Sequence, residues 1–130
     1  MGKIAFVFPG QGAQSVGMGK DTLDIPAAKR IFDQADEAVG YALSSIIFEG
    51  PEDTLRSTAN TQPALLAASL AYLAAFREAG GGSITPDYVA GHSLGEWTAL
   101  AAAGAIEPGA AARLVHMRGR FMEEAVPGGR

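Results

Sequence analysis

The stretch YVAGHSLGEWTALAAAGA, residues 88–105, joins a short apolar run to an alanine-rich run through the pattern Gly-x-Ser-x-Gly. Short apolar runs are typical of buried strands, and alanine-rich segments favour helices. A serine placed between a strand and a helix in this pattern is typical of a nucleophile elbow, whose sharp turn exposes the hydroxyl. We therefore expect a strand over 88–93, a nucleophile at Ser93 and a helix from residue 94 onward.

The two glycines of the pattern, Gly91 and Gly95, have a steric reason, because a side chain at either position would collide with the turn or its neighbours. The amides after Ser93 begin a helix, so they are unpaired and carry the positive end of its dipole. Such amides suit a developing oxyanion, and Leu94 would donate one of them. A plainer role stays open, in which Ser93 only caps the helix.

A second glycine-rich turn, FPGQGAQ (8–14), follows the β-rich run KIAFVF (3–8). It lacks the residues of a phosphate loop and the third glycine of a dinucleotide fingerprint. In a parallel sheet this turn and the elbow both lie at carboxyl ends of strands, where α/β proteins bind ligands. Gln11 is therefore a candidate for a second oxyanion amide opposite Leu94, and an ordinary turn is the alternative.

The remaining chain is mostly helical in pattern. Strands that alternate with helices predict an α/β fold with a parallel sheet covered on both faces. Two strands do not complete such a sheet, so we expect residues 1–130 to be the amino-terminal part of a larger domain. The expected helices are 26–40, 43–48, 52–56, 60–82 with an Asn60 or Thr61 cap as the most buried one, 94–105 and 108–125.

Composition excludes several classes of function. The net charge is −4 without a Lys/Arg cluster, so nucleic acid is not an expected partner. The chain has no cysteine and only two histidines, so we expect no metal site. The first apolar run is too short for a secretory signal, which indicates the cytosol, and the longest, 64–76, is too short to span a membrane.

Arg118 stands out on the last expected helix. A helical projection places it on an apolar stripe rather than on the polar face, within about 60° of Leu114, Val115, Phe121 and Met122. An arginine there needs an anion, and its planar fork fits a substrate carboxylate. The alternative is a salt bridge to Glu96 or another acid of the protein.

Neither histidine is a convincing base for Ser93. His116 falls on the polar face of its helix with Arg113, Arg120 and Glu123, away from Arg118, and we expect it at the surface. His92 neighbours Ser93, but successive side chains of an extended segment point to opposite sides, so we expect a packed core histidine there.

Four segments stand out together: FVFPGQGAQSVGMG (6–19), NTQPALLA (60–67), GHSLGEWTALAAAGA (91–105) and RLVHMRGRFMEEAVP (113–127). They resemble the malonyl-CoA:acyl carrier protein transacylase family, in the family's order and spacing. The resemblance implies the amino-terminal part of the large α/β-hydrolase-like subdomain, without the ferredoxin-like small subdomain and the carboxyl-terminal part. The general-base histidine of the family lies beyond Arg130, so the isolated chain should turn over poorly.

By this resemblance Ser93 attacks the malonyl thioester, the amides of Gln11 and Leu94 bind the oxyanion, and Arg118 binds the malonyl carboxylate. Gln62 and His92 would lie in the substrate site. The implied partners are malonyl-CoA, acyl carrier protein and the missing carboxyl-terminal portion, with no cofactor and a role in fatty-acid biosynthesis. The alternatives are a polyketide-synthase acyltransferase fragment, an α/β-hydrolase fragment, or a non-catalytic module that binds acyl-CoA or a partner.

Overall fold

Two short parallel strands organise the structure, a computed structural model that describes residues 2–127. Strand β1 is Ala5–Phe8 and strand β2 is Tyr88–Gly91. They pair in parallel, with Ala5 opposite Tyr88 and Phe8 opposite Gly91. Both expected strands are therefore confirmed, each shorter than its apolar run, and their carboxyl ends lie side by side as a parallel pair requires.

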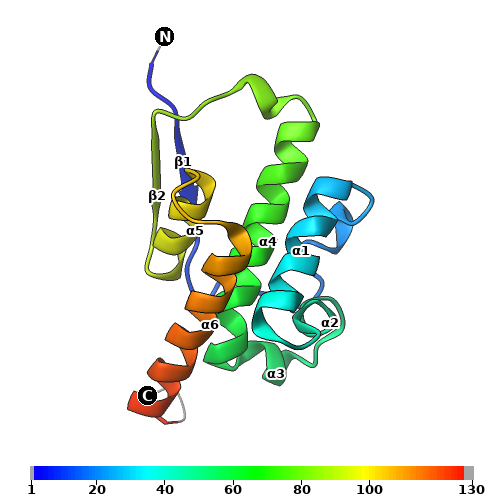
Figure 1. The fold of residues 1–130 in the computed structure, drawn as a ribbon, viewed down its shortest axis with the longest axis vertical. Helices are drawn as coiled ribbons and strands as arrows, with labels where there is room; N and C mark the ends of the chain where they lie inside the picture. Colours follow the sequence, from blue (N-terminus) through cyan, green and yellow to red (C-terminus); the bar gives the residue numbers. More distant parts are fainter. Residues whose placement is uncertain (1, 128–130) are drawn as a thin grey trace.

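Six helices lie to one side of this pair in residues 2–127 (Figure 1), and all were expected from the sequence. Their first residues include Pro26 and Pro108, since proline fits the first turn of a helix, where its missing N–H costs nothing. They are α1 Pro26–Val39, α2 Leu43–Glu49, α3 Glu52–Arg56, α4 Thr58–Glu78, α5 Leu94–Ala102 and α6 Pro108–Ala125, with 3-10 turns at Lys20–Thr22 and Gly81–Ser83.

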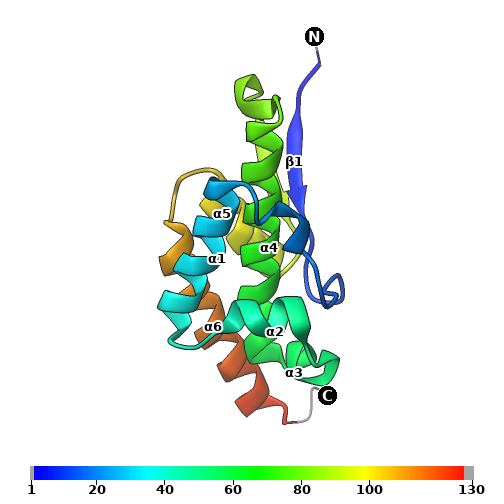
Figure 2. The ribbon, with the colours of Figure 1, turned by 90° about the vertical axis from the view of Figure 1, so that its right-hand side faces the viewer.

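Helix α4 is the centre of the core, as its apolar composition predicted. It lies between β1 on one side and α1 on the other (Figure 2), and α6 packs along it. Leu66 and Ala67 on α4 are fully enclosed, together with Phe32 of α1 and Val115 of α6. None of the helices of residues 2–127 has the length and apolar character that a membrane span requires.

The start of α4 corrects the expected cap. The helix begins at Thr58, not beside Asn60 or Thr61, and its N-cap residue Ser57 makes no side-chain capping bond to its own helix. Pro63 consequently lies inside the helix instead of in its first turn. The reason is tertiary, since a carboxylate from α6 reaches the amides of this first turn, as described below.

The sequence predicted a sheet covered by helices on both faces, and the structure differs from this prediction. Phe6 points toward α4, where its ring lies 6.0 Å from that of Phe76. On the other face Val7 is 73% exposed and Tyr88 is 62% exposed. Within residues 2–127 the helices therefore cover one face only. Parallel sheets are normally covered on both.

Candidate active site

Ser93 occupies a strained turn between β2 and α5. Its backbone angles are φ 54° and ψ −109°, and it is the one non-glycine residue with positive φ among residues 2–127. Strain of this kind is retained where the surrounding structure fixes it, often at functional sites. The side chain is exposed and makes no capping bond to α5. The expected strand–turn–helix geometry is confirmed, the side-chain cap that was the alternative is not formed, and the role of Ser93 as a nucleophile stays a prediction.

The glycines of the elbow allow the backbones to approach. A Cβ atom at Gly91 would lie 2.0 Å from the carbonyl carbon of Gly95, and one at Gly95 would lie 2.2 Å from the carbonyl oxygen of Phe8. A Cβ atom at Gly10 would lie 2.5 Å from the carbonyl oxygen of His92. The turn after β1 therefore packs directly against the elbow, as the parallel strand order predicted.

Arg118 reaches the serine. Its Nη2 donates to Ser93 Oγ at 3.0 Å, and its Nη1 donates to Gln62 Oε1 at 2.5 Å. Within the part of the chain that the structure describes, Arg118 forms no ion pair, neither with Glu96 nor with another acid. The salt-bridge alternative is wrong for these residues. The guanidinium lies at the serine with no carboxylate of the described chain against it.

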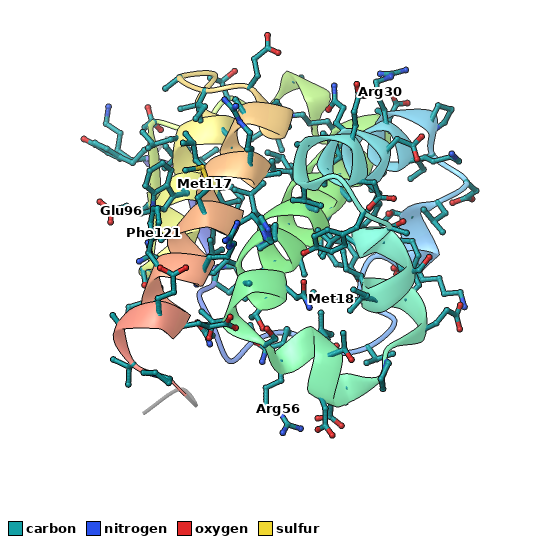
Figure 3. The ribbon with its side chains drawn as sticks, turned by 60° about the horizontal axis from the view of Figure 1, so that its bottom comes forward. Met18, Arg30, Arg56, Glu96, Met117 and Phe121 are labelled. Atoms are coloured by element: carbon teal, nitrogen blue, oxygen red, sulfur yellow. The ribbon has the colours of Figure 1, made fainter. Side chains whose placement is uncertain are left out.

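The buried face of α6 differs in part from the expected one. Val115 of the expected apolar stripe is buried, and the other buried residues are the small Ala111, Ala112 and Gly119. The large apolar residues that share a stripe with Arg118 are partly exposed, and Phe121 is 59% exposed. Figure 3 shows Met117 and Phe121 on the side of the molecule where Glu96 lies. With Trp97 and other side chains they line an apolar groove beside Arg118.

Gln62 links the arginine to the turn after β1. It is only 1% exposed, and its Nε2 donates to Gln11 Oε1 at 3.3 Å. Gln11 Nε2 in turn donates to Thr58 Oγ1 at 3.4 Å. Three predicted site residues, Gln11, Gln62 and Arg118, thus join Ser93 in one chain of side-chain hydrogen bonds.

The backbone amides of Gln11 and Leu94 are unengaged. Leu94 is the first residue of α5, where an amide has no partner within the helix. Across residues 2–127 neither amide donates a hydrogen bond to a backbone or side-chain acceptor. Both flank the exposed serine at the carboxyl ends of the two strands.

Both histidines depart from expectation. His92 is exposed instead of packed in the core, because β2 ends at Gly91 and the elbow leads the next side chain outward. His116 is partly buried instead of at the surface, with Nδ1 2.9 Å from the carbonyl oxygen of Ala59. A carbonyl oxygen only accepts, so Nδ1 donates. Among the described residues no histidine nitrogen is hydrogen-bonded to Ser93.

Glu123 was missed by the sequence reasoning, which placed it on the solvent face of α6. Its Oε1 accepts from the Ser57 hydroxyl at 2.7 Å and from the Ala59 amide at 3.1 Å. The Ser57 hydroxyl, followed by the Ala59 amide, lowers the pKa of the Glu123 carboxyl, and the charge of His116 adds a smaller contribution in the same direction. No local sequence pattern relates residues this far apart.

This lowered pKa predicts a pH-dependent contribution to stability. A carboxylate whose pKa falls on folding stabilises the protein above its unfolded-state pKa, and this stabilisation is lost as pH falls through the folded-state pKa. We expect the difference in free energy of unfolding between the wild type and Glu123→Gln to shrink from neutral pH to about pH 3. Urea titrations across this range measure it, and a difference independent of pH would contradict the assignment.

Comparison with known proteins agrees with this geometry. The acyl transferase domain family matches residues 5–130. The malonyl CoA-acyl carrier protein transacylase of Bacillus subtilis strain 168 is 57% identical over 99% of this chain, which covers 40% of that relative. The solved acyl-carrier-protein S-malonyltransferase of Burkholderia pseudomallei is 48% identical over 97% of the chain, again 40% of its own, with a TM-score of 0.89.

A second similar structure is a type II PKS acyl-carrier protein in complex with its malonyl-transacylase, 46% identical over 97% of this chain and 40% of its own, with a TM-score of 0.88. The chain thus spans about two fifths of the length of these relatives. The matches agree with the amino-terminal part of the α/β acyltransferase fold that the resemblance implied. The chain belongs to the acyl transferase domain family.

Proposed function

We propose that this chain carries the acyl-accepting part of a malonyl-CoA:acyl carrier protein transacylase, with Ser93 as the nucleophile. The observation that carries the proposal is the contact of 3.0 Å between Arg118 Nη2 and Ser93 Oγ. It places a guanidinium fork beside a strained, exposed hydroxyl, which fits an acyl group that bears a free carboxylate. Malonyl-CoA is such a substrate, and the names of the relatives point to the same compound.

The proposed reaction has two steps. Ser93 Oγ attacks the thioester carbon, a C–O bond forms, the C–S bond breaks, and coenzyme A leaves with the serine proton. The phosphopantetheine thiol of acyl carrier protein then attacks the acyl-serine, a new C–S bond forms, the C–O bond to Ser93 breaks, and the thiol proton passes to Ser93 Oγ. The amides of Gln11 and Leu94 stabilise the oxyanion of both steps. Arg118 holds the malonyl carboxylate, and Gln62 orients Arg118.

The base that takes the serine proton is proposed to come from outside the described residues. His116 uses Nδ1 on the Ala59 carbonyl, and His92 has no side-chain hydrogen bond among residues 2–127. Removal of the base from a serine–histidine pair costs several orders of magnitude in rate. The isolated chain should therefore acylate slowly, and a rate close to that of a full-length relative would contradict this part of the proposal.

Labelling with malonyl-CoA tests the nucleophile. We expect intact-mass spectrometry to show the gain of one malonyl group by the wild-type chain and none by Ser93→Ala, because the ester forms only on that hydroxyl. Ser83→Ala, at an exposed serine in the 3-10 turn Gly81–Ser83 and outside the proposed site, is the matched control and should label like the wild type. Equal labelling of Ser93→Ala would refute the proposal. Labelling by a simple ester but not by malonyl-CoA would favour a hydrolase.

A further inference from the structure

The first turn of α4 has two backbone defects that its own helix does not repair. Its N-cap residue Ser57 offers no side-chain acceptor to the free amides. Pro63 lacks an N–H, so the carbonyl oxygen of Ala59, four residues earlier, loses its helical donor. Unpaired backbone groups of this kind are costly when enclosed.

Helix α6 repairs both defects. Glu123 Oε1 accepts from the Ala59 amide and the Ser57 hydroxyl, and His116 Nδ1 donates to the Ala59 carbonyl at 2.9 Å. Both polar groups of one residue, Ala59, are therefore bound by side chains from α6, which lie two turns apart on that helix. These two contacts together fix the distance of the first turn of α4 from α6 and its rotation about the α4 axis.

Gly119 lies between these two side chains and allows the contact. A Cβ atom there would lie 2.6 Å from the carbonyl oxygen of Thr58 and 2.8 Å from Ala59 Cα. The backbone of α4 therefore rests directly on α6 at this point. We name His116, Gly119 and Glu123 together the α6 clamp.

We propose that the α6 clamp positions the Gln62–Arg118 pair, with Glu123 as its principal positioning residue. Gln62 lies one turn beyond Ala59 on α4, and Arg118 is next to Gly119 on α6. The bond of 2.5 Å from Arg118 Nη1 to Gln62 Oε1 therefore spans the two helices that the clamp holds together. Because the other arm of Arg118 reaches Ser93, a rotation of α4 would move the guanidinium away from the serine.

The effect of the α6 clamp on catalysis rests on the proposed function, but its effect on the position of Arg118 does not. The test therefore measures Arg118 directly and uses no substrate. NMR spectroscopy of the ¹⁵N-labelled chain measures the exchange of the Arg118 guanidinium protons with water. We expect Glu123→Ala to raise this exchange rate by about tenfold, because the bonds to Gln62 and Ser93 loosen. Glu123→Gln keeps an oxygen acceptor for the same two donors, so its Arg118 exchange rate should lie much closer to the wild-type rate than to that of Glu123→Ala.

Asp36→Ala is the matched control. Asp36 also accepts from a backbone amide and a serine hydroxyl, those of Ser44, at 2.7 and 2.5 Å. Its loss removes the same kind of bond at the junction of α1 and α2, and Arg118 exchange should stay within about twofold of the wild type. A general loosening of the fold would instead raise exchange at Arg118 equally in both variants, and would overturn the inference.

Unchanged Arg118 exchange in Glu123→Ala would also overturn it. If Glu123→Ala does not fold, Ser57→Ala provides the test, because it removes one of the two donors to Glu123 and leaves the bond from the Ala59 amide in place. An intermediate rise in Arg118 exchange supports the clamp, and no rise refutes it. Failure of malonyl labelling in the wild type would refute the proposed function but would not affect the exchange measurement. Failure of the proposed function and failure of the clamp proposal are therefore distinguishable.

Discussion

Gly91→Ala should lower the free energy of unfolding by about 3 kcal/mol or more and should prevent the elbow from forming. The added Cβ atom would lie 2.0 Å from both the carbonyl carbon and the carbonyl oxygen of Gly95, and 2.6 Å from the amide nitrogen of Glu96. These are backbone atoms that cannot rotate away, so α5 would have to separate from β2. Urea denaturation followed by circular dichroism measures the loss.

Gly109→Ala is the matched control for this prediction. Gly109 lies in the first turn of α6, and an added Cβ atom would find only the carbonyl oxygen of Gln34, at 3.8 Å. Alanine favours a helix over glycine, so this variant should be as stable as the wild type or more stable by up to about 1 kcal/mol. If Gly91→Ala were equally well tolerated, the close packing of the elbow described here would be incorrect.

Arg118→Lys should reduce the rate of labelling by malonyl-CoA about 100-fold, although the positive charge is kept. A guanidinium has two arms in one plane, and here one arm reaches Gln62 and the other reaches Ser93. A lysine ammonium is a single point charge on a flexible stem and does not form the two parallel bonds that fit a carboxylate. Intact-mass spectrometry at several times of reaction gives the rate.

Two comparisons separate carboxylate binding from general damage. Acetyl-CoA has no free carboxylate, so Arg118→Lys should label with it at nearly the wild-type rate. Arg120→Lys makes the same change at an exposed position of the same helix, and should leave both reactions unchanged. Equal losses with malonyl-CoA and acetyl-CoA in Arg118→Lys would show that the arginine supports the elbow without recognising the acyl group.

The proposals for Glu123 and Arg118 concern different parts of the same arrangement. Arg118 would contact the substrate, whereas Glu123 acts only through the first turn of α4 and Gln62. Loss of Arg118 should therefore abolish recognition of the carboxylate, while loss of Glu123 should weaken it and leave the guanidinium intact. The pH dependence of stability provides a third measure, because the lowered pKa of Glu123 means that the folded state favours its ionised form.

Much of the fold followed from local patterns in the sequence. The strands, the elbow at Ser93 and the bounds of α1 and α6 were predicted closely, because turn residues and helical spacing act over a few neighbours. Gly40 ends α1 in the left-handed conformation that glycine favours, with φ 86°. The convergence of Gln11 and Ser93 also followed, since parallel strands bring their carboxyl ends to one edge.

The face of α6 that is buried depended on the neighbouring helix. Spacing alone grouped Arg118 with Val115 and with three larger side chains, Leu114, Phe121 and Met122. The structure buries Val115 but leaves the three larger side chains at least partly exposed, and Gly119 instead lies against the backbone of α4. A helical projection gives the angles between side chains, but does not show which side another helix will take.

The amino-acid sequence by itself determined the elements, their order and the serine elbow, because these depend on residues only a few positions apart. The tertiary structure alone decided that Arg118 bonds to Gln62 and Ser93, that His116 is partly buried, and that Glu123 caps α4. These contacts join residues separated by 25 to 64 positions. Their geometry depends on how closely the helices pack, which no local pattern of residues specifies.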